Sequence, residues 1–502
     1  MTLRELANAI GAEASGELDV QVTDVTHDSR RCIPGSVFAA ICGARFDGHD
    51  YIAQAMERGA VAVISERPCP ADFSGSWLHV DDVRLALAFA AAEVFGHPSR
   101  QLQLVGVTGT NGKTTTTHLI DSIFRATGAP SAMLGTIHYR LGDEQRPADR
   151  TTPEAPDIQR FLREACLRGA RYAVMEVSSH ALELKRVHGS EFAVAVFTNL
   201  TPEHLDYHGT MERYFAAKRR LFEGVGGAPP RCVALNADDP WAMRLFEFAS
   251  SRSQRVLTYG LSENADVSAS SFQCGLTGLE FEARTPLGQL AIKSALVGRP
   301  HVYNVLAAIT VGLLLDLDEE VIVDGIRQCG PVPGRFEVVD EGQDFAVVVD
   351  YAHTHDALKN VLETARVLTP YRIITLFGCG GDRDLTKRAP MGEVAAQLSD
   401  MVIVTSDNPR SEDPEAIIRD IEVGLQRVGK PYSKIVDRRQ AIYHAIEQAR
   451  SGDLVLIAGK GHETYQLIKD QTIPFDDREV AREAIRQRLG TSSTQPASAT
   501  ER

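Results

Sequence analysis

Residues 102–126 constrain the fold of this chain more than any other stretch. An apolar run of β type, 102–107, leads into a glycine-rich turn, and the helical pattern that follows stops at Gly128. Lys113 and Thr114 close the turn and open the helix. In a phosphate-binding loop, this order aims backbone N–H groups and a lysine at phosphates, and offers a hydroxyl to Mg2+. The sequence therefore predicts an α/β domain that binds a nucleotide.

The match to the general pattern G-x-x-x-x-G-K-[ST] is incomplete. Val107 stands five residues before Gly112, where the pattern has glycine. The alternative interpretation is a strand-to-helix turn with incidental glycines. The Lys-Thr pair at the start of a helix favours the phosphate-binding loop, because the motif requires the pair there. The predicted ATP-binding residues are Gly109, Thr110, Asn111, Gly112, Lys113, Thr114 and Thr115.

Composition restricts the class of protein. The length of 502 residues suggests about three domains. The net charge of -14 argues against a nucleic-acid-binding protein, which would carry a basic face. The eight cysteines form no C-x-x-C pair, so reduced thiols in a cytoplasmic protein are expected. Neither a signal-peptide pattern nor an apolar run long enough to cross a membrane is present, so no membrane span is expected.

The pattern of strands and helices predicts an α/β protein with three domains. Residues 1–97 are expected to form a small α/β domain, and 98–335 a central P-loop ATPase domain with a mostly parallel sheet. Regular β-α alternation over 336–490 predicts a doubly wound, Rossmann-like domain. The low-complexity tail 491–502 is expected to be disordered.

Within the central domain, Glu176 lies inside an apolar strand. A buried carboxylate is costly unless a cation accompanies it, and Glu176 and His204 end neighbouring β-α units, so both could face the phosphates. A core glutamate and a surface histidine remain the structural alternative. Lys218 alone indicates only the solvated face of a helix. The polar stretch 142–150 is expected to be mobile, and the threonines after it to cap a helix.

Polar clusters also follow four predicted strands of the third domain. They comprise residues 350–353, 378–384, 406–410 and 459–463. The carboxyl ends of parallel strands are where such a sheet binds ligands, so a site is expected there. Each cluster alone could be a turn with a helix cap. Arg335, in the linker before this domain, could reach back to a phosphate.

In combination, four motifs resemble the Mur ligases, the ATP-dependent amide ligases of peptidoglycan synthesis. They are Thr-Gly-Thr-Asn-Gly-Lys-Thr at 108–114, Glu-Val-Ser-Ser-His-Ala at 176–181, His-Leu-Asp-Tyr-His-Gly at 204–209 and Asp-Asn-Pro-Arg at 407–410. The resemblance implies that the first domain holds the UDP end of a UDP-N-acetylmuramoyl-dipeptide. It also implies that the central domain uses ATP, and that the third binds the incoming amino acid and closes over the centre. A monomer is expected.

The resemblance assigns roles to matching positions. The implied catalytic residues are Lys113, Glu176, His204 and Lys218; the implied Mg2+ ligands are Thr114, Glu176, His204 and a carbamylated Lys218. The implied contacts to the UDP substrate are Ser29, His49, Thr151, Thr152, Ser178 and Arg186. Asn304, Arg335, Asp350 and His353 match the nucleotide pocket, and Arg383, Asp407, Asn408, Pro409, Arg410, Gly459 and Glu463 match the amino-acid site.

Arg410 bears on the choice of amino acid. In the family, this arginine accompanies meso-diaminopimelate, and lysine-adding relatives lack it. A guanidinium can bind a carboxylate through two hydrogen bonds, and diaminopimelate has a second carboxylate where lysine has none. The implied reaction is amide formation on UDP-N-acetylmuramoyl-L-alanyl-D-glutamate through an acyl phosphate.

The chain departs from the family pattern at Leu184, His301 and His355. Other functions also stay open. The nearest alternative is the same ligation with lysine. A folylpolyglutamate synthetase has a similar loop but lacks a UDP-binding domain like the first one here. A P-loop kinase or a GTPase-like switch would use the first motif and leave the Arg-rich third domain unexplained. A nucleotide-binding regulator would not need Glu176, His204 and Lys218 together.

Overall fold

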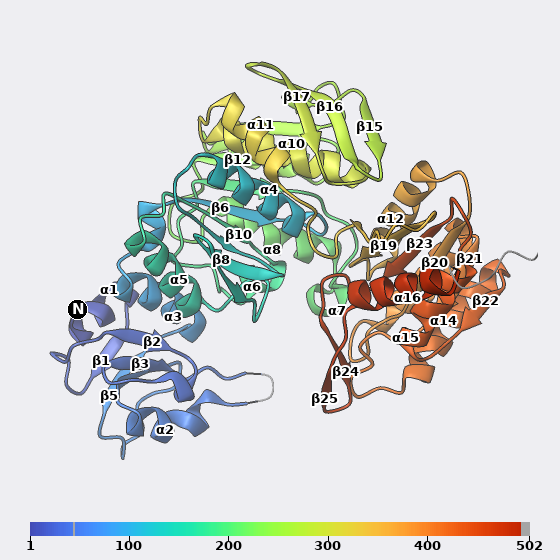
Figure 1. The fold of residues 1–502 in the computed structure, drawn as a ribbon. Helices are drawn as coiled ribbons and strands as arrows, with labels where there is room; N and C mark the ends of the chain where they lie inside the picture. The colour runs from blue at the N-terminus through green and yellow to red at the C-terminus, as the bar shows by residue number, and fades with distance from the viewer. Residues whose placement is uncertain (44–45, 493–502) are drawn as a thin grey trace, which may run out of the picture.

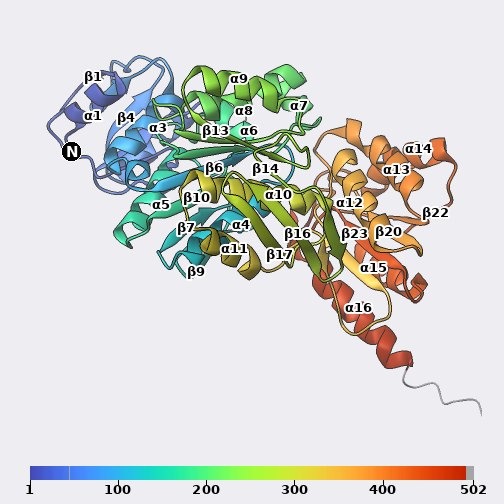
Figure 2. The ribbon, with the colours of Figure 1, turned by 90° about the horizontal axis from the view of Figure 1, so that it is seen from above.

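The computed structural model describes residues 1–43 and 46–492 (Figure 1). Along the chain, three parallel-rich sheets follow one another, which confirms the predicted α/β class. Figure 2 shows the central sheet between the first and the last. In the described part of the chain, no helix is long and apolar enough to cross a membrane.

The N-terminal unit is a five-stranded sheet in the order β1-β5-β4-β3-β2. Helices α1 and α3 cover one face through Leu3, Leu6 and Leu87, and α2 covers the other through Ala55. Its elements are α1 (Leu3–Ile10), β1 (Glu13–Ser15), β2 (Asp24–Thr26), β3 (Ser36–Ala39), α2 (Ile52–Glu57), β4 (Ala60–Ser65), β5 (Ser76–His79) and α3 (Val83–Val94).

The central sheet has twelve strands, and its parallel core runs β13-β12-β11-β6-β10-β7. Its strands are β6 (Gln103–Thr108), β7 (Ser131–Leu134), β8 (His138–Leu141), β9 (Glu144–Pro147), β10 (Tyr172–Glu176), β11 (Val194–Phe197), β12 (Cys232–Asn236), β13 (Arg255–Gly260), β14 (Val267–Ser268), β15 (Phe272–Gly275), β16 (Gly278–Thr285) and β17 (Gly288–Ser294). The phosphate-binding loop follows β6, which lies inside the sheet between β10 and β11.

Helices cover both faces of this sheet. One core cluster holds residues of α4, α10 and α11, and the other holds residues of α5, α8 and α9. The helices are α4 (Lys113–Ala126), α5 (Ala155–Leu167), α6 (Ser179–Glu183), α7 (Leu205–His208), α8 (Met211–Glu223), α9 (Ala242–Ser251), α10 (Arg299–Leu314) and α11 (Glu319–Gln328).

Two local predictions for the central unit were wrong. The stretch expected to be mobile contains the strand β9. This strand pairs with β8, and Arg146 within it forms ion pairs with Glu144 and Glu164. The helix expected to be capped by a threonine has Glu154 at its N-cap, without a side-chain hydrogen bond. The threonines are therefore free for other contacts.

The third unit is doubly wound, as predicted. Its six-stranded sheet has the order β18-β19-β23-β20-β21-β22 and is parallel except at β18. Core residues of α12, α13 and α14 lie on one face, and those of α15 and α16 on the other. A separate hairpin, β24 (Tyr465–Ile468) and β25 (Gln471–Pro474), follows β23.

The remaining elements are β18 (Glu337–Val338), β19 (Ala346–Asp350), α12 (His355–Leu368), β20 (Ile373–Phe377), α13 (Arg388–Leu398), β21 (Met401–Val404), α14 (Pro414–Val428), β22 (Tyr432–Lys434), α15 (Arg438–Gln448), β23 (Leu454–Ala458) and α16 (Asp477–Ser492). Helix α16 thus includes the first two residues of the predicted tail, and 493–502 lie outside the described residues.

Candidate active site

The phosphate-binding loop is held in place by the end of the neighbouring strand β11. Thr110 N–H donates to Asn199 O, Asn111 N–H donates to Asn199 Oδ1 at 2.8 Å, and Thr198 Oγ1 donates to Asn111 O at 2.6 Å. Gly109 has φ of 152°, and a Cβ there would overlap the Thr198 hydroxyl. The loop therefore requires glycine for its own packing as well as for any phosphate.

Substituting Gly109 tests this packing. We expect Gly109→Ala to lower the free energy of unfolding by about 3 kcal/mol, since overlap and backbone strain each cost about 1–3 kcal/mol. Gly128→Ala is the matched control, because a Cβ at Gly128 meets no atom within 4 Å and only the positive φ is strained. Urea unfolding of both variants measures the difference, and equal losses would contradict the account.

Two lysines, the half-buried Lys113 and the buried Lys218, converge on one carbonyl of the loop. Lys113 Nζ donates to Gly109 O at 2.9 Å and Thr110 O at 2.7 Å, and Lys218 Nζ donates to Gly109 O at 2.7 Å. Lys218 is 2% exposed and lies over the Tyr214 ring, so it is not on a solvated face. Burial lowers the pKa of both amines, and the charge of Lys113 lowers the pKa of Lys218 further. Two cations this close create a site that favours anions.

Glu176 lies beside the loop at the end of β10. Its Oε2 accepts from Thr114 Oγ1 at 3.0 Å and its Oε1 from Thr136 N–H at 2.7 Å. The side chain is 1% exposed, and no Lys, Arg or His of the described residues lies within ion-pair distance of it. A buried carboxylate beside a hydroxyl is the oxygen donor set that Mg2+ prefers when phosphates and waters complete its shell. Thr114 and Glu176 therefore fit such an ion.

His204 lies in a neighbouring group of side chains rather than on Glu176. It has a left-handed backbone with φ of 56°, and its ring contacts His180 at a centroid distance of 4.7 Å. Its Nε2 lies 3.8 Å from Glu203 Oε2. Burial lowers the pKa of His204 to about 4, so the ring is neutral near pH 7 and can donate a lone pair to a metal. Among the described residues, no three His, Cys, Asp or Glu side chains form a metal-binding cluster.

Glu203 is a candidate that the sequence analysis missed. Burial alone would raise its pKa, but a hydrogen bond from His353 and the charge of Lys113 hold the pKa well below its usual value. His353 Nε2 lies 3.4 Å from Glu203 Oε1. The position of Glu203, immediately before His204 and after the end of β11, could have identified it from the sequence, because ligands of parallel sheets gather at strand ends.

Three contacts join the third unit and its linker to the central unit. Besides the pair of Glu203 and His353, Asn111 Nδ2 donates to Asp356 Oδ2 at 3.1 Å. Arg335 donates to Thr114 Oγ1 at 3.1 Å and lies over the Tyr351 ring, so this linker arginine does reach the loop. The predicted nucleotide residues of the two units thus lie together.

The other predicted nucleotide residues have structural contacts. Asn304 Oδ1 accepts from Thr116 Oγ1 at 3.3 Å, and His301 lies 3.1 Å from the Asn304 amide nitrogen. Asp350 is buried and accepts from Phe336 N–H at 2.7 Å. Thr115 is buried in α4.

The departures at His355 and Leu184 also have places in the fold. His355 is the first residue of α12, a position that proline also favours, so the turn is kept. Leu184 is the C-cap residue of α6.

The predicted contacts to a UDP substrate form two groups. In the N-terminal unit, Ser29 donates to Gln54 at 2.6 Å, and His49 lies between Asp47 and Ser65. In the central unit, Thr152 donates to Glu176 O at 2.8 Å and accepts from Ser178 N–H, Thr151 accepts from Thr136 Oγ1, and Arg186 pairs with Glu154 at 2.9 Å.

A cavity of about 560 Å³ lies between the N-terminal and central units. Its lining includes Asp28 and Arg31 from the N-terminal unit, and Pro153 and Glu154 from the central unit. Ser29 and Thr152 are sequence neighbours of these lining residues. The cavity thus adjoins one residue of each predicted group, Ser29 and Thr152.

The predicted amino-acid residues gather at the carboxyl edge of the third sheet. A Cβ on Gly380 would meet both Arg410 Nη1 and the Arg383 side chain, so the two arginines lie side by side. Pro409 packs against Gly381, and Asp407 against Gly459, where φ is 115°. Asn408 Nδ2 donates to Glu463 Oε2 at 2.8 Å. The edge therefore presents two guanidinium groups near two carboxylates.

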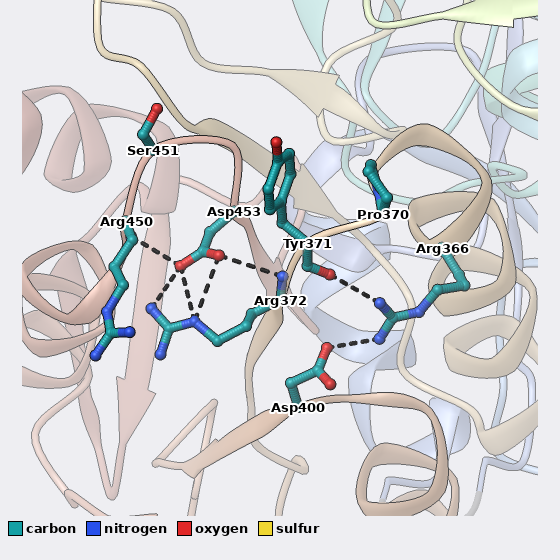
Figure 3. Close-up of a pocket in the computed structure, with 8 residues that line it drawn as sticks. All are labelled: Arg366, Pro370, Tyr371, Arg372, Asp400, Arg450, Ser451 and Asp453. Atoms are coloured by element: carbon teal, nitrogen blue, oxygen red, sulfur yellow. Dashed lines mark hydrogen bonds and ion pairs between the residues drawn. The ribbon is translucent and has the colours of Figure 1, made fainter.

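A second cavity, of about 350 Å³, lies at the opposite edge of this sheet (Figure 3). Its charged residues precede the strands: Asp400 pairs with Arg366, and Asp453 pairs with Arg372. The two carboxylates also accept from the Ile373 and Arg372 N–H groups at the amino end of β20. The cavity is thus a structural feature away from the predicted residues.

Comparison with known proteins gives the family. The chain matches the Mur ligase middle domain over 107–312, the glutamate ligase domain of Mur ligases over 334–461, and the Mur ligase family catalytic domain over 21–93. It is 52% identical over 466 residues to the UDP-N-acetylmuramoyl-L-alanyl-D-glutamate–2,6-diaminopimelate ligase of Solibacter usitatus, covering 93% of this chain and 94% of the relative. The chain belongs to the Mur ligase family.

Solved structures agree with this assignment. A UDP-N-acetylmuramoyl-L-alanyl-D-glutamate–2,6-diaminopimelate ligase superposes with a TM-score of 0.69 at 33% identity, covering 97% of this Mur ligase and 99% of that chain. A folylpolyglutamate synthase of Mycobacterium tuberculosis complexed with ADP and AMPPCP has a TM-score of 0.62 at 17% identity, covering 81% of this chain and 95% of that chain. The second likeness shows the shared fold alone.

Proposed function

We propose that this Mur ligase adds meso-diaminopimelate to UDP-N-acetylmuramoyl-L-alanyl-D-glutamate and converts ATP to ADP and phosphate. The observation that carries the proposal is the pair of arginines, Arg383 and Arg410, at the carboxyl edge of the third sheet, where Asn408 bonds Glu463. The name of the Solibacter usitatus relative supports the same substrate pair.

The reaction proceeds in two steps. The D-glutamate γ-carboxylate attacks the γ-phosphorus of ATP, which gives an acyl phosphate and ADP. The diaminopimelate amine then attacks the acyl carbon, loses a proton, and phosphate leaves from a tetrahedral intermediate. Phosphoryl transfer depends mainly on positioning and charge neutralisation. Lys113, Arg335 and the N–H groups of the loop supply both around Gly109–Thr114.

The metal ligands in the proposal are Thr114, Glu176 and His204, with Lys218 as a carbamate. When bound, Mg2+ neutralises phosphate charge and orients the phosphates. Lys218 suits carbamylation because its lowered pKa leaves a larger share of neutral amine, the form that reacts with carbon dioxide. The carbamate would replace one of two neighbouring positive charges by a negative one.

The two arginines and the two carboxylates bind different groups of the amino acid. Arg410 and Arg383 bind its carboxylates, and Glu463 and Asp407 face its ammonium. Contacts between the third unit and the loop, such as that of Asn111 with Asp356, keep water from the acyl phosphate. One chain carries every proposed residue, so the proposal needs only a monomer. It also includes a cytoplasmic location, where ATP is available.

Lysine as the amino acid is the second candidate, and Arg410 distinguishes it. We expect Arg410→Ala to raise KM for diaminopimelate about 10–100-fold, the value of one or two charged hydrogen bonds. KM for ATP should stay unchanged. Arg419→Ala is the matched control, because Arg419 is exposed on α14. Steady-state phosphate release measures these constants, and better use of lysine than of diaminopimelate by the wild type would contradict the proposal.

A further inference from the structure

Arg410 has a backbone conformation that must be held from outside. Its φ is 52°, in the left-handed region that residues other than glycine seldom adopt. Its guanidinium donates to Gly381 O at 2.8 Å, which directs it toward Arg383. A residue in this conformation persists where neighbouring contacts fix it.

The hairpin β24–β25 supplies these contacts. Arg410 N–H donates to Leu467 O at 3.0 Å, and Lys469 N–H donates to Arg410 O at 2.6 Å. Arg410 and Ile468 thus form an isolated β-bridge between the loop after β21 and the hairpin. A two-stranded hairpin has little stability of its own, so its position depends on what anchors it.

Gln466 is one of the anchors. Its side chain is 8% exposed, and its Nε2 donates to Asp407 O at 2.6 Å, three residues before Arg410. The next residue, Leu467, donates its N–H to Asn408 Oδ1 at 2.9 Å. The hairpin therefore binds the loop at three successive points, Asp407, Asn408 and Arg410.

Lys460 anchors the loop itself, through Asn408. It is fully buried, and its Nζ donates to Asn408 Oδ1 at 3.0 Å and to Glu463 Oε2 at 2.9 Å. Asn408 Oδ1 thus accepts from both Lys460 and Leu467, while its Nδ2 donates to Glu463. With both its oxygen and its nitrogen engaged, Asn408 acts as a link within the protein.

We propose that Gln466, which holds the β24–β25 hairpin against the loop, and Lys460, which holds Asn408 and Glu463, are positioning residues that fix Arg410 for the distal carboxylate of the amino acid. This inference rests on the proposed function and extends it to residues outside the Asp-Asn-Pro-Arg motif. The two residues act through Arg410 and Glu463 and need not touch the substrate.

The test is a double-mutant cycle between Gln466 and Arg410. We expect Gln466→Leu to raise KM for diaminopimelate about tenfold, because a small misplacement of a binding group is costly. KM for ATP and for the UDP substrate should change less than about twofold. In the Arg410→Ala background, Gln466→Leu should add less than about a further twofold, since the group it positions is gone. Gln471→Leu, exposed on the same hairpin, is the matched control.

Lys460→Met gives a second variant, for which we expect a higher KM for diaminopimelate and an unchanged KM for ATP. An equal rise in KM for all three substrates in Gln466→Leu would overturn the positioning role. Effects of Gln466→Leu and Arg410→Ala on KM for diaminopimelate that are fully additive would overturn it as well. No turnover of diaminopimelate by the wild type would overturn both this inference and the proposed function. Normal wild-type turnover with an unchanged KM in Gln466→Leu would overturn the inference alone.

Discussion

Replacing Lys113 by methionine is expected to lower kcat about 10³-fold. The side chain is half-buried in the phosphate-binding loop, where its ammonium donates to Gly109 O and Thr110 O. A preorganised cation in a site shielded from water stabilises the charge that develops during phosphoryl transfer, and loss of one such group costs about 10²–10³-fold or more. Phosphate release under saturating substrates measures the loss.

The same variant should not unfold the protein. Lys113 and Lys218 repel each other, and the charge of Lys113 lowers the pKa of Lys218. Removing one charge relieves this repulsion, so we expect Tm to stay the same or rise. Lys359→Met is the control for the substitution, because Lys359 is exposed on α12. A fall in Tm that parallels the fall in kcat would mean that the loop had collapsed instead.

Replacing Lys218 by methionine is expected to lower kcat about 10²-fold, through loss of the proposed carbamate. The wild type should take up ¹³C-labelled bicarbonate and give a carbamate signal in the ¹³C NMR spectrum, and Lys218→Met should not. Uptake should increase with pH, because only the neutral amine reacts. Full activity in protein freed of carbon dioxide would contradict the role of the carbamate.

The lowered pKa of Lys218 also predicts a pH dependence of stability in protein freed of carbon dioxide. In the unfolded chain the amine keeps its proton up to a pKa of about 10.4, whereas in the folded chain burial removes the proton at a lower pH. The unfolded state binds more protons between these values, so the free energy of unfolding rises with pH there. In Lys218→Met the free energy of unfolding, measured with urea, should rise less with pH than in the wild type.

Much of the fold was predictable because the third unit repeats one local pattern. Each apolar run such as 454–458 forms a parallel strand, and each polar cluster follows a strand's carboxyl end. Parallel strand ends share one edge, so the meeting of Arg383, Arg410 and Glu463 follows from the alternation alone. Arg335 was predictable as a bridging residue from its place in the linker.

The rest depends on tertiary contacts that sequence patterns do not contain. Lys218 lies on an amphipathic helix, and only the packing of α8 against the loop buries it. Thr152 looked like a helix cap, but its hydroxyl bonds the end of β10 instead. Gln466 is polar and stands in a short hairpin, so nothing local distinguishes it from the exposed Gln471.

The most direct test of the proposed reaction is product analysis by mass spectrometry. The protein is incubated with ATP, Mg2+ and UDP-N-acetylmuramoyl-L-alanyl-D-glutamate, with either meso-diaminopimelate or lysine. The account predicts a new amide product with diaminopimelate, one ADP and one phosphate for each amide, and little product with lysine. Hydrolysis of ATP without an amide product in either mixture would contradict it.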